Sequence, residues 1–174
     1  MKAVLLDREG TIIVDPSFDR VDAVEKIQLL PRTLEALRLF AVHGYGVIII
    51  TNQTNIAQGR ITEQGFWDLH SKVLELIKPS GVTVLKTYVC PHSATEGCEC
   101  RKPQPGLLLN AIQDFDLSST STYMVGDRDS DVLAGKNAGI KTVLVRTGKH
   151  PTTVTDADYT ADDLLTAAQY ITNI

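Results

Sequence analysis

Carboxylate, hydroxyl and ammonium side chains occur along this chain in an order that suits chemistry at a phosphorus atom. Asp7 and Glu9 follow a short apolar run near the N-terminus, and Thr51 ends a second apolar run. Lys102 comes later and is followed by an acidic turn that contains Asp127. A carboxylate that attacks phosphorus needs donors for the phosphoryl oxygens, and further carboxylates to hold a metal ion that offsets the charge. The order of these residues therefore predicts a metal-assisted phosphoryl-transfer site.

A second group of residues has the composition of a metal site. Cys90, His92, Cys98 and Cys100 include every cysteine of the chain and fall within one short segment. Four soft or borderline donors leave no coordination position for a reactive water, which is typical of a closed structural zinc site. The alternative is that reduced cysteines are neighbours without binding an ion. A secreted disulfide scaffold would spread its cysteines, so we expect a reducing compartment and a cytoplasmic protein.

The elements that must position these residues are short apolar runs rich in β-branched residues. They cover residues 3–6, 47–51, 83–89, 122–125 and 142–145. Because the runs are almost continuously apolar instead of alternating, they predict buried parallel strands. Asp7, Thr51 and Asp127 lie at or just beyond the ends of three such runs. In an open parallel sheet, ligands bind at the edge formed by these carboxyl ends.

Helical patterns alternate with the predicted strands. We expect one helix opened by Pro31, one capped by Thr62, one that begins near Pro105, and two more over residues 130–138 and 162–171. Strands that alternate with helices predict an α/β protein, a three-layer α/β/α Rossmann-like sandwich around a central parallel sheet. Residues 12–30 carry few helix signals and predict a flap beside the site, with no room for a large inserted cap domain.

Length and charge restrict the possible partners. With 174 residues, of which 43% are hydrophobic, residues 1–174 are expected to form one domain with a sizeable core. The formal net charge of −4 and the absence of an evident basic stripe argue against nucleic acid as a partner. No apolar stretch approaches membrane-spanning length, so we expect no membrane partner. We also expect the protein to be a monomer.

Four separated motifs resemble those of the haloacid dehalogenase (HAD) superfamily of phosphatases. In chain order they are Asp7-Arg8-Glu9-Gly10-Thr11, Thr51-Asn52-Gln53, Arg101-Lys102-Pro103 and Gly126-Asp127-Arg128-Asp129-Ser130-Asp131. The resemblance extends from residue 1 to about residue 149. More narrowly, the chain is similar to the branch that holds the heptose bisphosphate and histidinol-phosphate phosphatases.

The resemblance implies a Mg²⁺-dependent phosphomonoester hydrolase that acts on a small phosphorylated metabolite through an aspartyl-phosphate intermediate. Asp7 matches the nucleophile of the family. Asp7, Asp127 and the main-chain carbonyl of Glu9 match the Mg²⁺ ligands. Asp131 is expected not to bind the metal directly, but to orient Lys102 or a metal-bound water.

The phosphate-binding residues also follow from the resemblance. It assigns Thr51 to the phosphoryl oxygens and leaves Asn52 close to the phosphate or leaving group. Taken alone, these two residues would equally suit the end of a strand and a turn. Lys102 is expected to neutralise the pentacoordinate phosphorus, and the guanidinium of Arg101 can fork onto a phosphate or another substrate oxygen.

Glu9 departs from the family pattern, which has aspartate as the acid–base residue at this position. Glutamate keeps the carboxyl group but moves it by one methylene, and acid–base geometry tolerates little displacement. Three explanations stay open: a functioning variant with a shifted pocket, a weakened or engineered enzyme, or a non-catalytic sugar-phosphate-binding protein.

The motifs divide between two substrate classes. The short gap from His92 to Cys98 is similar to the histidinol-phosphate group. By contrast, Thr51-Asn52-Gln53 with the following residues 56–60, and residues 145–149, are more similar to the heptose group. A heptose bisphosphate is the expected substrate, and histidinol phosphate is the alternative.

Overall fold

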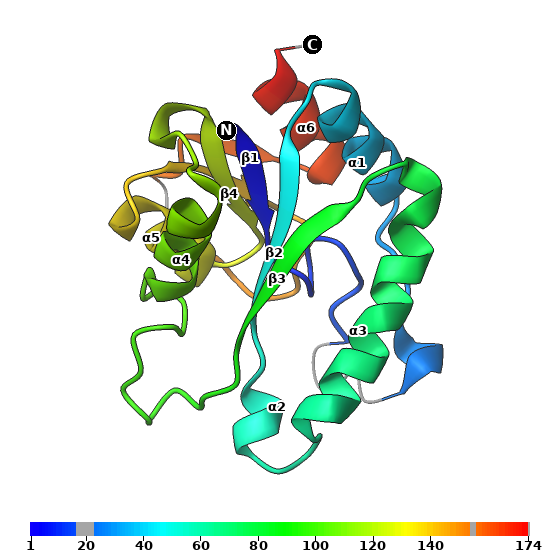
Figure 1. The fold of residues 1–174 in the computed structure, drawn as a ribbon, viewed down its shortest axis with the longest axis vertical. Helices are drawn as coiled ribbons and strands as arrows, with labels where there is room; N and C mark the ends of the chain where they lie inside the picture. Colours follow the sequence, from blue (N-terminus) through cyan, green and yellow to red (C-terminus); the bar gives the residue numbers. More distant parts are fainter. Residues whose placement is uncertain (17–22, 154–155, 174) are drawn as a thin grey trace.

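The central element of the fold is a parallel sheet of six strands in the order β3-β2-β1-β4-β5-β6 (Figure 1). The structure is a computed structural model, and it describes residues 1–16, 23–153 and 156–173. The strands are β1 (Ala3–Leu6), β2 (Gly46–Asn52), β3 (Val84–Cys90), β4 (Thr122–Gly126), β5 (Lys141–Val145) and β6 (Tyr159–Ala161). The five predicted strands are confirmed, and β6 is an addition.

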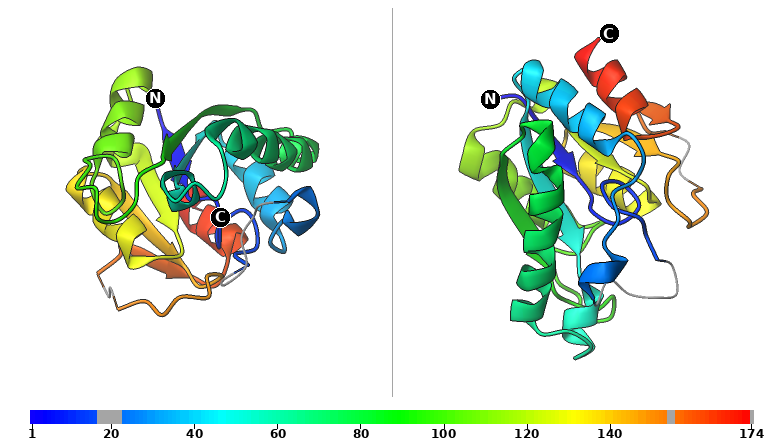
Figure 2. Two further views of the ribbon diagram at one scale, coloured as in Figure 1. Left: turned by 90° about the horizontal axis from the view of Figure 1, so that it is seen from below. Right: turned by 90° about the vertical axis from the view of Figure 1, so that its right-hand side faces the viewer.

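Helices cover both faces of this sheet. They are α1 (Thr33–Val42), α2 (Thr54–Ala57), α3 (Glu63–Ile77), α4 (Gly106–Phe115), α5 (Asp129–Asn137) and α6 (Leu164–Thr172), with single 3₁₀ turns at Val24–Lys26, Lys78–Ser80 and Ser119–Ser121. Helices α1, α3 and α6 pack on one face, whereas α4 and α5 pack on the other (Figures 1 and 2). The predicted three-layer α/β/α sandwich is therefore confirmed.

The two-sided burial explains why the strands are apolar throughout. Val4 and Leu6 of β1 join the core beneath α1, α3 and α6, whereas Ala3 and Leu5 join the core beneath α4. Successive side chains of a strand point to opposite faces, so a strand covered on both faces needs an apolar residue at every position. All four residues have no exposed surface.

The helix starts were predicted with mixed success. The hydroxyl of Thr62 accepts a hydrogen bond from the backbone N–H of Gly65 at 2.9 Å, so this residue caps α3 as expected. The prediction that Pro31 opens a helix was wrong by two residues. Helix α1 begins at Thr33, after Arg32 turns the chain through a left-handed conformation with φ 63°.

The segment after β1 lies against the sheet edge that carries the predicted site. The backbone N–H of Val14 donates to Gln28 O at 2.9 Å, and that of Leu30 donates to Ile12 O at 3.0 Å. Residues 17–22, the middle of the expected flap, lie outside the described residues. Within the described ranges, no helix combines the length and the apolar character that a membrane span requires.

Candidate active site

Asp7 and Lys102 form a buried ion pair at the carboxyl edge of the sheet. Asp7 directly follows β1, and its backbone N–H donates to Val125 O at 2.9 Å, which extends the pairing between β1 and β4. The ammonium of Lys102 donates to Asp7 Oδ1 at 2.6 Å and to Ile50 O at 3.0 Å, and it lies 2.6 Å from Asp131 Oδ1. Burial opposes the charge of the ammonium, but Asp131 and Asp7 outweigh it and raise the pKa of Lys102. The lysine is therefore a fixed cation beside Asp7.

Asp127 is a buried carboxylate to which no described residue donates a hydrogen bond. It is 1% exposed, and among the described residues neither carboxylate oxygen has a hydrogen-bond partner. The nearest cation is the guanidinium of Arg128, whose Nε lies 3.8 Å from Oδ2. Carboxylate oxygens of Asp7, Asp127 and Asp131 lie within 4.8 Å of one another.

The electrostatics of this carboxylate cluster favour a bound cation. Burial, with repulsion from Asp131 and Glu9, raises the pKa of Asp7 to about 7 against the opposing effect of Lys102. Burial, together with the charges of Asp7 and Asp131, raises the pKa of Asp127 to about 8. Hard divalent cations such as Mg²⁺ bind oxygen ligands and would offset this repulsion. The residues present therefore fit a magnesium site.

Glu9 is held by donors from three neighbouring residues. Its Oε1 accepts from Arg8 Nε at 2.8 Å and from Arg8 Nη2, and its two oxygens lie 3.1 and 3.2 Å from Gln53 Nε2. The hydroxyl of Thr51 donates to Oε2 at 3.3 Å. Burial alone would raise the pKa of Glu9, but Arg8 and then Gln53 outweigh it and lower that pKa. Glu9 is therefore an ionised carboxylate that accepts hydrogen bonds from Arg8, Thr51 and Gln53.

Arg8 is the partner that fixes this glutamate. Its side chain is 1% exposed, and Cζ lies 4.8 Å from the ring centroid of Phe66 on α3, a cation–π distance. Phe66 in turn stacks on the ring of His70, with an interplanar angle of 9°. The buried guanidinium thus connects Glu9 to the core packing of α3.

Asn52 and Arg101 support the loop that carries Lys102. The side-chain amide of Asn52 donates to Lys102 O and accepts from Lys102 N, each at 3.1 Å. Arg101 Nη1 donates to Thr54 Oγ1 at 2.7 Å and to His92 O at 3.2 Å. The structure therefore brings Thr51 next to Glu9, and it links Asn52 and Arg101 by hydrogen bonds to the segment around Lys102.

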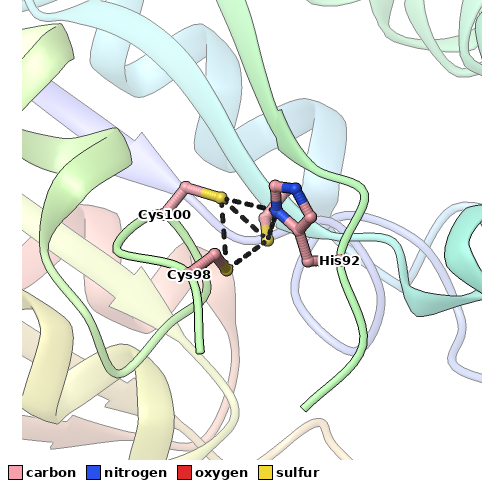
Figure 3. Close-up of side chains that lie close together, drawn as sticks. His92, Cys98 and Cys100 are labelled. Carbon is pink, nitrogen blue, oxygen red and sulfur yellow. Dashed lines mark hydrogen bonds between the residues drawn. The ribbon is translucent and has the colours of Figure 1, made fainter. Parts of the chain in front are cut away.

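Cys90, His92, Cys98 and Cys100 converge into one cluster (Figure 3). The sulfur–sulfur distances are 3.7 Å for Cys90–Cys98, 3.1 Å for Cys90–Cys100 and 3.5 Å for Cys98–Cys100. His92 Nδ1 lies 3.6 Å from Cys90 Sγ and 3.2 Å from Cys100 Sγ. Sulfurs around a tetrahedral zinc ion are about 3.8 Å apart, so a modest expansion would admit the ion. All three cysteines are free thiols, and the cluster could bind zinc.

Comparisons with known proteins agree with this geometry. The HAD-hydrolase-like family model matches residues 99–167. A D-glycero-beta-D-manno-heptose-1,7-bisphosphate 7-phosphatase from Pasteurella multocida is 40% identical over 156 residues, 85% of this chain and 83% of that protein. This chain belongs to the HAD superfamily, in the family of these phosphatases.

Two further members of this HAD family extend the comparison. A D-glycero-alpha-D-manno-heptose-1,7-bisphosphate 7-phosphatase from Campylobacter jejuni is 38% identical over 144 residues, 83% of this chain and 81% of that protein. The solved structure of D,D-heptose 1,7-bisphosphate phosphatase from B. bronchiseptica, complexed with magnesium and phosphate, has a TM-score of 0.89 at 27% identity and covers 99% of both chains. The predicted HAD resemblance is thus confirmed over nearly the whole chain.

Two contributors to this HAD phosphatase site were not predicted from the sequence. Gln53 and Arg8 were each noted only as part of a motif, and neither was given a role. One signal was available for Arg8. It lies between Asp7 and Glu9, where a cation can neutralise two carboxylates that the strand end brings into a buried position.

Proposed function

We propose that this chain is a Mg²⁺-dependent phosphatase that removes the 7-phosphate from a D-glycero-D-manno-heptose 1,7-bisphosphate, with residues 1–174 as one domain. The observation that carries the proposal is the buried pair of Asp7 and Lys102 beside a carboxylate, Asp127, that no described residue satisfies. The names of the relatives in both anomeric series support the choice of substrate. The free thiols support a reducing, cytoplasmic location.

The reaction follows from the positions of the side chains. An oxygen of Asp7 attacks the phosphorus, the bond from phosphorus to the C7 oxygen breaks, and Lys102 offsets the charge on the phosphoryl oxygens. Thr51 is available to bind those oxygens. Glu9, which must first take up a proton because it is ionised in the resting site, would supply that proton to the leaving oxygen. A water molecule then attacks the phosphorus of the aspartyl phosphate and gives a proton to the Glu9 carboxylate. The bond between phosphorus and the Asp7 oxygen breaks, and the Asp7 carboxylate and inorganic phosphate are released.

Two metals complete the proposal. Asp7, Asp127 and the main-chain carbonyl of Glu9 would hold Mg²⁺, which would supply positive charge to offset the negative charge of the phosphoryl group. Cys90, His92, Cys98 and Cys100 would hold a structural Zn²⁺. Lys102 follows the last zinc ligand by two residues, so the same loop would carry the structural ion and the catalytic ammonium.

The substrate assignment is tested with both anomers of the heptose bisphosphate and with histidinol phosphate. We expect release of the C7 phosphate, followed by ³¹P NMR, with kcat/KM at least about 100-fold above that for histidinol phosphate, because the site must discriminate by hydrogen bonds to the sugar. A preference for histidinol phosphate would overturn the assignment. That result would agree with the short segment between His92 and Cys98, which is similar to the histidinol-phosphate group.

Glu9→Asp should raise kcat about tenfold on alkyl phosphates with little change in KM. The shorter side chain reaches Arg8 less well, so the pKa of the carboxyl group rises and a larger fraction of it carries the proton that the leaving oxygen needs. The shorter side chain also matches the family geometry. Because the buried guanidinium loses part of its pairing, we expect a loss of about 1–3 kcal/mol in the free energy of unfolding. Steady-state kinetics and thermal unfolding measure the two effects.

The leaving group provides the control for this variant. p-Nitrophenolate leaves without a proton, so Glu9→Asp should change kcat little on p-nitrophenyl phosphate. Glu75→Asp makes the same deletion of one methylene on the exposed face of α3 and should leave all rates unchanged. A lower kcat on alkyl phosphates would show that the pocket is built around glutamate. An equal gain on both kinds of substrate would show that the effect does not fall on protonation of the leaving oxygen.

A further inference from the structure

The loop after β5 lies directly against the carboxylate of Asp127. A Cβ atom built on Gly148 would lie 1.9 Å from Asp127 Oδ2, and one built on Gly10 would lie 2.5 Å from the same oxygen. The hydroxyl of Thr147 donates to Gly10 O at 2.5 Å. The loops after β1 and β5 are therefore joined to each other, and the carboxylate is in contact with both.

Packing, together with the Arg128 guanidinium 3.8 Å away, orients this carboxylate without a hydrogen bond from the described residues. Neither oxygen of Asp127 has a hydrogen-bond partner among the described residues, although both oxygens are buried. The contacts with Gly10 and Gly148 are close enough to exclude even a methyl group. A buried carboxylate without donors keeps one orientation only if its neighbours leave it no other space.

Gly148 does not adopt the left-handed conformation that usually requires glycine. Gly10 has φ +80°, a left-handed conformation that side chains rarely adopt, whereas the φ of Gly148 lies outside this range. Alanine at Gly148 would therefore not require a left-handed backbone, and the three atoms nearest to its Cβ would all belong to Asp127. The missing side chain at this position makes room for the carboxylate.

We infer that Thr147 and Gly148 are positioning residues that orient Asp127 toward Asp7. The inference rests on the proposed function, in which these two acids bind Mg²⁺. Gly148 leaves the space that the carboxylate fills, and Thr147 keeps the Gly148 loop against the Gly10 loop. An added methyl group at Gly148 forces Asp127 to rotate or shift, which separates its oxygens from those of Asp7.

The test is direct Mg²⁺ binding by calorimetry, without substrate. Gly148→Ala should weaken binding at least about tenfold, the usual effect of disturbing a group that orients a metal ligand. Thr147→Val, which removes the hydroxyl, should also weaken binding, whereas Thr147→Ser keeps the donor and should bind like the parent. Rescue by serine distinguishes the hydrogen bond from general packing.

Gly65→Ala is the matched control. Its new Cβ would meet the side chains of Ile61 and Thr62 at 3.1 Å, near the start of α3, and should leave Mg²⁺ binding unchanged. Thermal unfolding without added Mg²⁺ or chelator checks that each variant is folded. If Gly148→Ala does not fold, the Thr147 pair, which is a smaller change, tests the inference. Parent-like Mg²⁺ binding by folded Gly148→Ala, or by Thr147→Val, would overturn the inference. A parent protein that neither binds Mg²⁺ nor hydrolyses phosphate esters would overturn the proposed function instead.

Discussion

Asp7→Asn is expected to lower kcat at least about a thousandfold, because an amide cannot form the phosphoryl ester that a carboxylate forms. The fold should persist, since the substitution removes one charge from a cluster in which burial and like charges raise the pKa of Asp7 to about 7. Rapid acid quench and mass spectrometry should detect one added phosphoryl group on the parent and none on the variant.

Asp114→Asn is the control for this experiment. Asp114 is an exposed carboxylate of α4 that accepts hydrogen bonds from Lys86 and Tyr88, each at 2.6 Å. This variant should keep the turnover of the parent. Wild-type Mg²⁺-dependent turnover by Asp7→Asn would disprove the proposed mechanism.

The second large effect is expected from loss of the proposed zinc ion. The parent should contain one zinc per chain by elemental analysis, and Cys98→Ser should contain almost none. A loss of roughly 3 kcal/mol in a domain of this size lowers the Tm by about 10 °C. Turnover should fall as well, because Lys102 follows the ligand Cys100 by two residues.

Ser93→Ala separates zinc loss from general disturbance of the loop. The Ser93 hydroxyl lies 3.2 Å from that of Thr95, within the segment between the proposed ligands His92 and Cys98. This variant should keep its zinc and its Tm. A stable parent protein that contains neither zinc nor iron after careful purification would refute the metal assignment.

The sheet and the positions of the main acids could be predicted because each rests on a local pattern. Continuous apolar runs predicted five strands. Because Asp7 and Asp127 follow two of these strands, they were predicted to lie together at the carboxyl edge of the sheet. β6 was missed because Tyr159–Ala161 is a short segment without an apolar run. Its role as an outer strand beside β5 is set by tertiary pairing.

The side-chain partners could not be predicted, because they depend on which loops meet. Asn52 was expected near the phosphate, yet its amide pairs with the main chain of Lys102, a residue far along the sequence. The burial of Arg8 depends on the position of Phe66 on α3. The need for glycine at Gly148 depends on where Asp127 points, and no spacing in the sequence contains that information.

The crowding of buried acids also makes the proposed magnesium ion a competitor of protons. In the unfolded chain the carboxyl groups of Asp7 and Asp127 ionise near their ordinary pKa of 3.8, whereas in the metal-free fold they ionise at about 7 and about 8. Between these values the folded chain holds more protons, so the stability of the metal-free protein falls as the pH rises. A cation that binds the ionised acids must release these protons. Its affinity therefore increases with pH up to about 8, and it stabilises the fold most where the empty cluster is least stable.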